Sequence, residues 1–471
     1  MQASELHLPQ ADPSLVVSSL LFEPISHSLA LVRSDSSLLL YPPFSSFPPS
    51  SPPLPPPSPT IIPPLSTTSS FLRFHPNPNP NSASRVIFLT ARPHAAGSSI
   101  LLRAWILTAA NSFAPICLDF NCKHGASSAA VIGLSHGFSV KIEGSVNFFA
   151  LYSASARKIW VLSVRLRDDR TCLDLMKCAV IDCTSPIYSL RVSMGLLLLG
   201  EVNGVRVFPM RLLVKGRVKK RRNMEVRSEN DNLSPKSDDF HKKQMDTSLK
   251  DMGGCCNGGG IELEGTAEIS SPVCKGGHRA DYSFAVCNIV KLRQDSGDLG
   301  SFFVAFKCSE VQSRNGLQTV TASLKAVSIH SLSQQRFLIL DSNGVLHLFS
   351  MHYTTIDSEV STRSCIPSRN GCMRSLNYTM KVQMLAVHPD IASRTYTIWI
   401  SDGSYSVHIM SFTDVDISAD ESNNDGSDGK LMQNSAVQAI FTSEKVQDII
   451  PYAANGVLIL GQGSIFAYGI A

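Results

Sequence analysis

Long apolar runs are missing from this chain of 471 residues. A membrane helix needs roughly 18 to 20 apolar residues, and the best stretch, Ser98–Leu107, is shorter and carries Arg103. A secretory leader is not indicated either, because Met1–Leu15 contains Glu5 and Asp12 and lacks a basic start followed by an apolar run. We therefore expect a soluble protein with no membrane contact, located in the nucleus, the cytoplasm or both.

An excess of one charge sign is also absent. There are 42 Lys and Arg residues against 38 Asp and Glu, a formal net charge of +4, so no general affinity for nucleic acid or anionic membranes follows. The 12 cysteines include no CxxC pair of the kind that holds zinc. We expect reduced thiols, no metal and no cofactor. The closest cysteine pairs are Cys117 with Cys122, Cys365 with Cys372, and Cys255 with Cys256.

Three segments lack the residues needed to build a core. The first, 42–66, is a Pro/Ser-rich insertion in which 12 of the 27 prolines fall between Pro42 and Pro64, and we expect it to stay outside any sheet. The second, 216–279, is basic, then polar, then Gly-rich, and its composition predicts disorder. The third, 413–434, is an acidic loop.

The rest of the chain repeats one pattern, a short apolar strand, a polar or Gly turn and a second alternating strand. A further strand precedes most good copies, and Asn203-Gly204, Asn343-Gly344 and Asp402-Gly403 supply residues that tolerate positive φ in tight hairpins. The good copies are Leu29–Tyr41, Leu196–Phe208, Phe337–Phe349, Thr397–Ile409 and Val457–Tyr468. The preceding strands are Leu15–Phe22, Ile187–Val192, Leu324–Ile329, Val382–Val387 and Val446–Ile450, and weaker copies are Val86–Leu107, Val131–Ile142 and Phe149–Val164.

This repetition predicts an all-β fold, because no apolar stripe of helical period persists for three turns outside the breaks. Four-stranded units take roughly 40 to 50 residues each, so the ordered part accommodates seven to nine, and long loops favour the low end. Such units are stable when packed radially. We expect a single β-propeller over 1–471, with seven blades as the central estimate in a range of six to eight, closed by Leu15–Phe22 adding to the last blade. A pair of β-sandwich domains is the alternative.

Two copies carry a family resemblance. Val16–Pro24 followed by Leu29–Tyr41, and Val382–Pro389 followed by Thr397–Ile409, are similar to the second to fourth strands of a WD40-type propeller blade. The resemblance implies the architecture and carries over no functional residue.

Candidate catalytic groups have simpler interpretations. Gly133-Leu-Ser-His-Gly137 matches the nucleophile elbow of serine hydrolases, but alternating residues follow it where a helix is required, so Ser135 is better interpreted as part of a hairpin turn. Four histidines lie on or beside repeat strands, and we do not expect them to hold a metal or act in catalysis. They are His330, His347, His388 and His408. His347 and His408 occupy similar positions in the second hairpin strand, so we expect these two to face solvent or a neighbouring blade. We assign no catalytic residue.

The segment Arg211–Arg222 has seven basic residues and no acidic one. Such runs are typical of nuclear import signals or nucleic-acid patches. Downstream, Ser234 precedes a proline and Ser237 precedes two aspartates, which makes both candidate phosphorylation sites whose added negative charge would weaken receptor binding. The residues assigned to the import signal are Lys215, Arg217, Lys219, Lys220, Arg221 and Arg222.

The leading functional hypothesis is a non-catalytic scaffold that presents loop surfaces to other proteins, with an import receptor among them, in a nuclear complex. One alternative is a propeller subunit of an RNA- or chromatin-acting assembly that contacts phosphates through residues 211–222. A serine hydrolase using Ser135 is the third, and the sequence disfavours it.

Overall fold

A computed structural model describes most of the chain, with gaps. The main compact unit comprises 1–218 and 287–471, and a second unit, 219–286, lies outside the described residues. Most of the three expected insertions therefore lies outside the described part as well. The described residues are 2–8, 14–43, 58–64, 67–76, 84–120, 130–134, 140–167, 171–215, 289–297, 300–306, 323–355, 365–376, 380–390, 395–413, 438–453 and 455–469.

The described strands form seven four-stranded antiparallel groups, which we call blades I to VII. Blade I contains β2 (Val17–Glu23), β3 (Ser28–Arg33), β4 (Leu38–Tyr41) and β5 (Thr60–Ile62). Blade II contains β6 (Thr68–Phe74), β7 (Arg85–His94), β8 (Ser99–Leu107) and β9 (Phe113–Phe120), with a 3-10 turn at Ala95–Gly97. Blade III contains β11 (Val140–Gly144), β12 (Phe148–Ser153), β13 (Lys158–Leu166) and β14 (Cys172–Asp182).

The remaining blades follow the same order. Blade IV contains β15 (Ser189–Ser193), β16 (Leu196–Glu201), β17 (Gly204–Pro209) and β19 (Phe302–Ala305), and α1 (Met210–Lys215) follows β17. Blade V contains β20 (Ala326–Ser331), β21 (Arg336–Asp341), β22 (Leu346–Thr355) and β23 (Cys365–Leu376). Blade VI contains β24 (Met384–Asp390), β25 (Thr395–Ser401), β26 (Ser406–Thr413) and β27 (Gln438–Phe441). Blade VII contains β28 (Asp448–Ala453), β29 (Gly456–Leu460), β30 (Ile465–Gly469) and β1 (Gln2–Glu5).

Two further strands cover edges. β10 (Ala130–Ile132) pairs with β8, and β18 (Val290–Arg293) pairs in parallel with β14. The first half of β14 also pairs in parallel with β9, so that blades II and III share one ten-stranded sheet. The outer edge of β14 is thereby hydrogen-bonded along most of its length, which removes an edge that could template aggregation.

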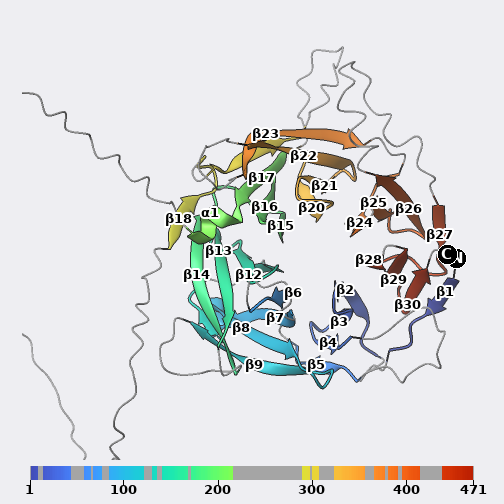
Figure 1. Cartoon of the computed structure of the whole chain (residues 1–471). Coiled ribbons are helices and arrows are strands. Elements are labelled where there is room, and N and C mark those ends of the chain that lie inside the picture. The colour runs from blue at the N-terminus through green and yellow to red at the C-terminus, as the bar shows by residue number, and fades with distance from the viewer. Residues whose placement is uncertain are drawn as a thin grey trace, which may run out of the picture. The chain divides into compact units, whose positions relative to one another are not determined.

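The hydrophobic core of the main unit lies between the blades. The described residues form seven clusters of buried apolar side chains, and each cluster combines residues from two consecutive blades, including VII with I. The first strands also contact one another in a closed cycle, β2 to β6, β11, β15, β20, β24, β28 and back to β2 (Figure 1). Because a sheet with two apolar faces must cover both, a closed ring is the arrangement that leaves no face bare. The all-β propeller predicted from the sequence is confirmed.

Ring closure uses a different strand from the one expected. β1, not Leu15–Phe22, pairs with β30 as the outer strand of blade VII, over the register Gln2–Gly469 to Glu5–Phe466. β2 instead begins blade I, and its Leu20 N–H donates to Asp448 Oδ2 of β28 at 2.8 Å. Closure therefore combines main-chain pairing at the outer edge with a side-chain bond at the inner edge.

Two other expectations about strands were wrong. The end of the Pro/Ser-rich insertion, Thr60–Ile62, pairs with β4 as the fourth strand of blade I. The proposed hairpin Val131–Ile142 is divided between two blades, because Ala130–Ile132 pairs with β8 and Val140–Gly144 pairs with β12. β5 pairs with β4 across the Pro/Ser-rich insertion, and β10 pairs with β8 instead of with the strand that follows it, so neither pairing has a local hairpin signal.

Candidate functional site

Two hairpin turns on adjacent blades build the first candidate surface. In blade V, Asp341 Oδ1 accepts the N–H groups of Asn343 and Val345, both at 2.9 Å, and Gly344 takes a φ of +83°. The Gly344 carbonyl accepts the Val382 N–H at 3.1 Å, which fixes this turn against the segment leading into blade VI. The sequence Asp-Ser-Asn-Gly dictates this turn, since its carboxylate satisfies backbone donors and its glycine tolerates positive φ.

The matching turn of blade VI is held in the same way. Ser401 Oγ accepts the Gly403 N–H at 3.1 Å and donates to the Ser406 carbonyl at 2.8 Å. Asp402 Oδ1 accepts the Ser404 N–H at 2.9 Å, and Gly403 takes a φ of +79°. Both turns are therefore rigid supports for the side chains that they carry.

Exposed apolar side chains gather on these supports. Tyr405 is 51% exposed and Phe441, at the end of β27, is 79% exposed, although large aromatic side chains are ordinarily buried. Tyr405 directly precedes β26, which pairs with β27. Ser406 is the register partner of Phe441, and the Thr442 N–H donates to the Tyr405 carbonyl. Val345 on the blade V turn is also exposed. We call residues 342–345, 380–383, 402–405 and 441–442 the turn platform.

A serine–histidine–aspartate chain lies within blade V beside the platform. His347 Nε2 is 2.9 Å from Asp341 Oδ2, and Ser375 Oγ is 3.2 Å from His347 Nδ1. His347 is 2% exposed and stacks on Phe306 of the neighbouring blade at 4.3 Å. Burial by itself would raise the pKa of the Asp341 carboxyl, but hydrogen bonds from His347 and from the backbone N–H groups of Val345 and Asn343 lower it overall. These hydrogen bonds connect β21, β22 and β23 to the blade V turn. A buried imidazole with both ring nitrogens engaged in this way is not placed to receive a substrate proton.

The other histidines have local partners or lie in strands. His330 Nε2 is 2.8 Å from Ser328 Oγ, and burial, with a contribution from Arg191, lowers the pKa of His330 to about 3. His408 Nε2 is 3.3 Å from Ser406 Oγ, and His388 is half-buried in β24. His347 faces the neighbouring blade and not solvent, which is one of the two orientations expected for it. Among the described residues, no three His, Cys, Asp or Glu side chains gather in a way that could hold a metal ion.

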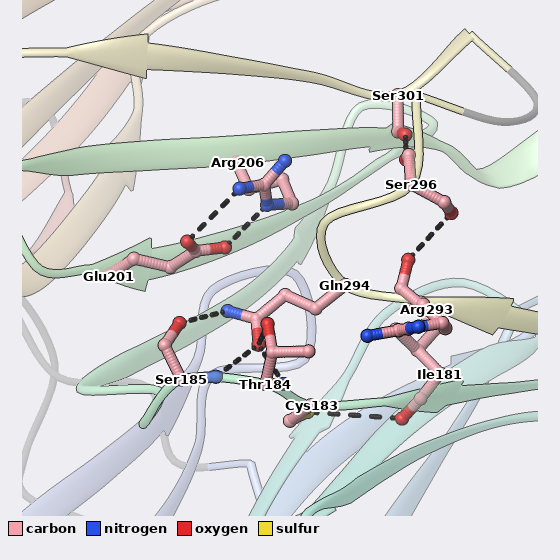
Figure 2. A network of polar contacts seen from close by, with 10 residues as sticks. All are labelled: Ile181, Cys183, Thr184, Ser185, Glu201, Arg206, Arg293, Gln294, Ser296 and Ser301. Carbon is pink, nitrogen blue, oxygen red and sulfur yellow. Dashed lines mark hydrogen bonds and ion pairs between the residues drawn. The ribbon is translucent and has the colours of Figure 1, made fainter.

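The root of the long insertion forms a second candidate surface. α1 packs Met210 and Leu213 into the core between blades III and IV, and the chain returns as β18, whose Leu292 joins the same core. Gln294, fully buried, then accepts the N–H groups of Thr184 and Ser185 at 2.8 and 2.9 Å. Figure 2 shows this side chain reaching the 184–185 turn. Both ends of the segment between them are thus fixed to blades III and IV.

A buried ion pair reinforces the same region. Arg206 Nε donates to Glu201 Oε1 at 2.7 Å (Figure 2). The guanidinium also lies 5.1 Å from the ring centre of Phe303 on β19. Burial raises the pKa of the nearby Cys183 thiol to about 12, which keeps it protonated and unreactive at neutral pH. This region is a structural anchor with no reactive group exposed.

The sequence-derived site residues are only partly described. Lys215 is exposed as the last residue of α1, and Arg211 is exposed on the same helix. Ser135, Ser234 and Ser237 lie outside the described residues, as do the other import-signal residues Arg217, Lys219, Lys220, Arg221 and Arg222. The residues that sequence reasoning missed are Lys291 and Arg293, exposed basic side chains on β18. β18 pairs with β14, which α1 also contacts. The alternating pattern of β18 and the residue before it, Ile-Val-Lys-Leu-Arg, was the available signal.

Comparisons with known proteins identify no family. No protein-family model and no curated protein matches the chain. No helix among the described residues is long and apolar enough to cross a membrane. Among solved structures, the β-propeller domain of Cps50 (Swd1) from Myceliophteria thermophila is 7% identical, with a TM-score of 0.46 and coverage of 100% of both chains. U3-55K is 7% identical, with a TM-score of 0.43 and coverage of 99% of this chain and 98% of that chain. Sqt1 of Saccharomyces cerevisiae is 7% identical, with a TM-score of 0.45 and coverage of 100% of this chain and 86% of that chain. The chain itself is a β-propeller, as its own sheets and closed core show.

Proposed function

We propose that this protein is a non-catalytic β-propeller scaffold that binds a protein partner through the turn platform. The observation that carries the proposal is the adjacent pair of exposed aromatic side chains, Tyr405 on the blade VI turn and Phe441 at the end of β27. Large exposed apolar side chains rimmed by polar residues mark interaction surfaces, and aromatic residues supply most of the binding energy at such surfaces. The partner is expected to present an apolar surface with polar edges.

The test compares variants of the full chain in affinity purification, followed by binding measurements with each recovered partner. Tyr405→Ser and Phe441→Ser should each weaken binding of a specific partner about 10-fold or more. Ile25→Ser is the matched control, because Ile25 is equally exposed but lies in the turn between β2 and β3. A partner set unchanged by the platform variants, or lost equally in the control, would contradict the proposal.

A second candidate function rests on the insertion root. Arg211 and Lys215 on α1 and Lys291 on β18 are exposed basic residues on two segments that both pack on β14. Arg211 and Lys215 belong to the basic run 211–222, and Lys291 adds to it. We propose that this run acts in nuclear import or in phosphate contact within an RNA- or chromatin-acting assembly. Lys215→Glu with Lys291→Glu should reduce the salt-dependent affinity for RNA or DNA, and Lys445→Glu near the platform serves as the control.

Nuclear import is tested separately with a fluorescent fusion. Changing Lys219, Lys220, Arg221 and Arg222 to Ala should lower the nuclear fraction, and Ser234→Asp with Ser237→Asp should lower it in part. A nuclear fraction equal to that of the unmodified protein would remove the import proposal and leave the scaffold proposal intact.

A further inference from the structure

The parallel pairing between blades II and III places two cysteines directly opposite each other. β9 and β14 pair over four residues, in the order Cys117–Cys172, Leu118–Leu173, Asp119–Asp174 and Phe120–Leu175. Alternation along a strand puts the leucines on one face, where they join the core. The other face carries the cysteine pair and the aspartate pair.

Arg167 fixes the register of this pairing. Its Nη2 donates to Asp119 Oδ2 at 2.9 Å and to Asp174 Oδ1 at 2.7 Å, so it binds one carboxylate from each blade. Its backbone N–H also donates to the Cys172 carbonyl at 3.0 Å. The aspartate pair lies two residues along from the cysteine pair on the same face, so the ion pairs hold the cysteines opposite each other as well.

The geometry of the cysteine pair suits a covalent link. Neighbouring strands lie about 4.7 to 4.9 Å apart in the hydrogen-bonding direction, which lies inside the Cα separation range of disulfides, about 4.4 to 6.8 Å. The Cys172 thiol donates to the Leu173 carbonyl at 3.9 Å, and Cys117 lies close enough to raise the pKa of that thiol. Cys178 and Cys183 are buried in a different core, between blades III and IV, where their thiols donate to carbonyl oxygens.

We propose that Cys117 and Cys172 form a reversible disulfide that links blades II and III when the protein meets a low-molecular-weight disulfide such as oxidised glutathione. Cys117 is the more exposed thiol, and Cys172 is 1% exposed. Cys117 therefore loses its proton and attacks one glutathione sulfur, and the first glutathione leaves and takes up a proton. Cys172 then loses its proton and attacks the Cys117 sulfur, and the second glutathione leaves. In total two protein thiols are oxidised and one glutathione disulfide is reduced to two thiols.

The rate and the effect of this step follow from the surroundings. Burial raises the pKa of the Cys172 thiol to about 12, which makes the second attack slow at neutral pH. The product joins two blades whose outer strands otherwise meet through four residue pairs and one arginine. Oxidation is therefore expected to stabilise this seam of the ring and to compensate for loss of Arg167.

The experiment oxidises the intact full chain with glutathione disulfide and maps its peptides without reduction. Trypsin cleaves after Arg103, Lys123, Arg170 and Lys177, so the expected product is peptide 104–123 linked to peptide 171–177. Peptide 104–123 also holds Cys122, and fragmentation must place the bond on Cys117. A bond on Cys122, or a Cys172 that stays reduced in the folded protein after prolonged incubation, would overturn the proposal.

Thermal unfolding gives a second, independent readout. The oxidised protein should melt several degrees above the reduced protein, and this gain should vanish in Cys117→Ser but persist in Cys178→Ser, the matched variant on β14. Arg167→Ala should melt lower when reduced and recover on oxidation. If a serine variant fails to fold, the peptide map of the unmodified chain decides alone. An equal gain on oxidation in Cys117→Ser would also refute the proposal.

Discussion

The turn platform depends on Gly344 for two separable reasons. Its φ of +83° is a conformation that L residues disfavour. A Cβ added there would also lie 2.8 Å from the Val382 carbonyl oxygen and 2.6 Å from Lys381 Cγ, both closer than real contacts allow. Gly97 has the same φ of +83° but no atom within 4 Å of an added Cβ. The pair Gly344→Ala and Gly97→Ala therefore separates collision from backbone strain.

The two effects have different magnitudes. Alanine in the left-handed region costs about 1 to 2 kcal/mol, and the lower entropy of the unfolded chain offsets about 0.4 to 1 kcal/mol of that. Gly97→Ala should thus lower the free energy of unfolding by about 1 kcal/mol. Gly344→Ala adds a forced shift of backbone, worth about 1 to 3 kcal/mol. Its total loss should be about 2 to 4 kcal/mol.

Urea unfolding followed by tryptophan fluorescence measures both variants. Trp399 is fully buried in blade VI, against which the Gly344 turn packs, and so it reports on this region. We expect Gly344→Ala to lower the unfolding midpoint by at least twice as much as Gly97→Ala. Equal shifts for the two variants would show that the contact with Val382 does not constrain the turn, and the rigid platform would lose its main support.

Three further predictions concern buried charges. Glu201→Gln should lower the free energy of unfolding by about 3 kcal/mol because it leaves the Arg206 guanidinium without its carboxylate partner. The double variant Glu201→Gln with Arg206→Met should recover part of this loss. If the losses of the two single variants simply add in denaturant unfolding, the prediction is wrong. Arg33 is 5% exposed, and its Nε and Nη1 have no hydrogen-bond partner among the described residues. Arg33→Met should therefore raise the melting temperature by an amount equivalent to about 1 kcal/mol, and a lower melting temperature would disprove this. Burial raises the pKa of Asp448 from 3.8 to about 6, so the folded state binds the proton more tightly than the unfolded state. The protonated carboxyl therefore stabilises the fold fully below the unfolded-state pKa of 3.8. This stabilisation, up to about 3 kcal/mol, is lost as the pH rises through 6. Asp448→Asn should flatten the stability profile between pH 4 and 7, and an unchanged profile would exclude this assignment.

Local sequence determined the individual hairpins. Phe337–Phe349 has two short apolar segments on either side of Asp-Ser-Asn-Gly, and the structure has strands at Arg336–Asp341 and Leu346–Thr355 with Gly344 at positive φ. Alternation fixes which side chains face a core, and turn chemistry fixes where the chain reverses, because both depend on neighbours within a few residues. For the same reason the all-β class followed from the repeats.

Tertiary structure decided which strands pair across long distances. Thr60–Ile62 follows a run of prolines and still completes blade I, and Gln2–Glu5 closes the ring, because each finds an unpaired strand edge that only the folded ring presents. Cys122 is the cysteine nearest to Cys117 in the sequence, whereas the structure places Cys117 opposite Cys172. The aromatic pair on the turn platform likewise joins residues from separate strands. Such contacts require closure of long loops and are selected by the free energy of the whole core, so no local pattern records them.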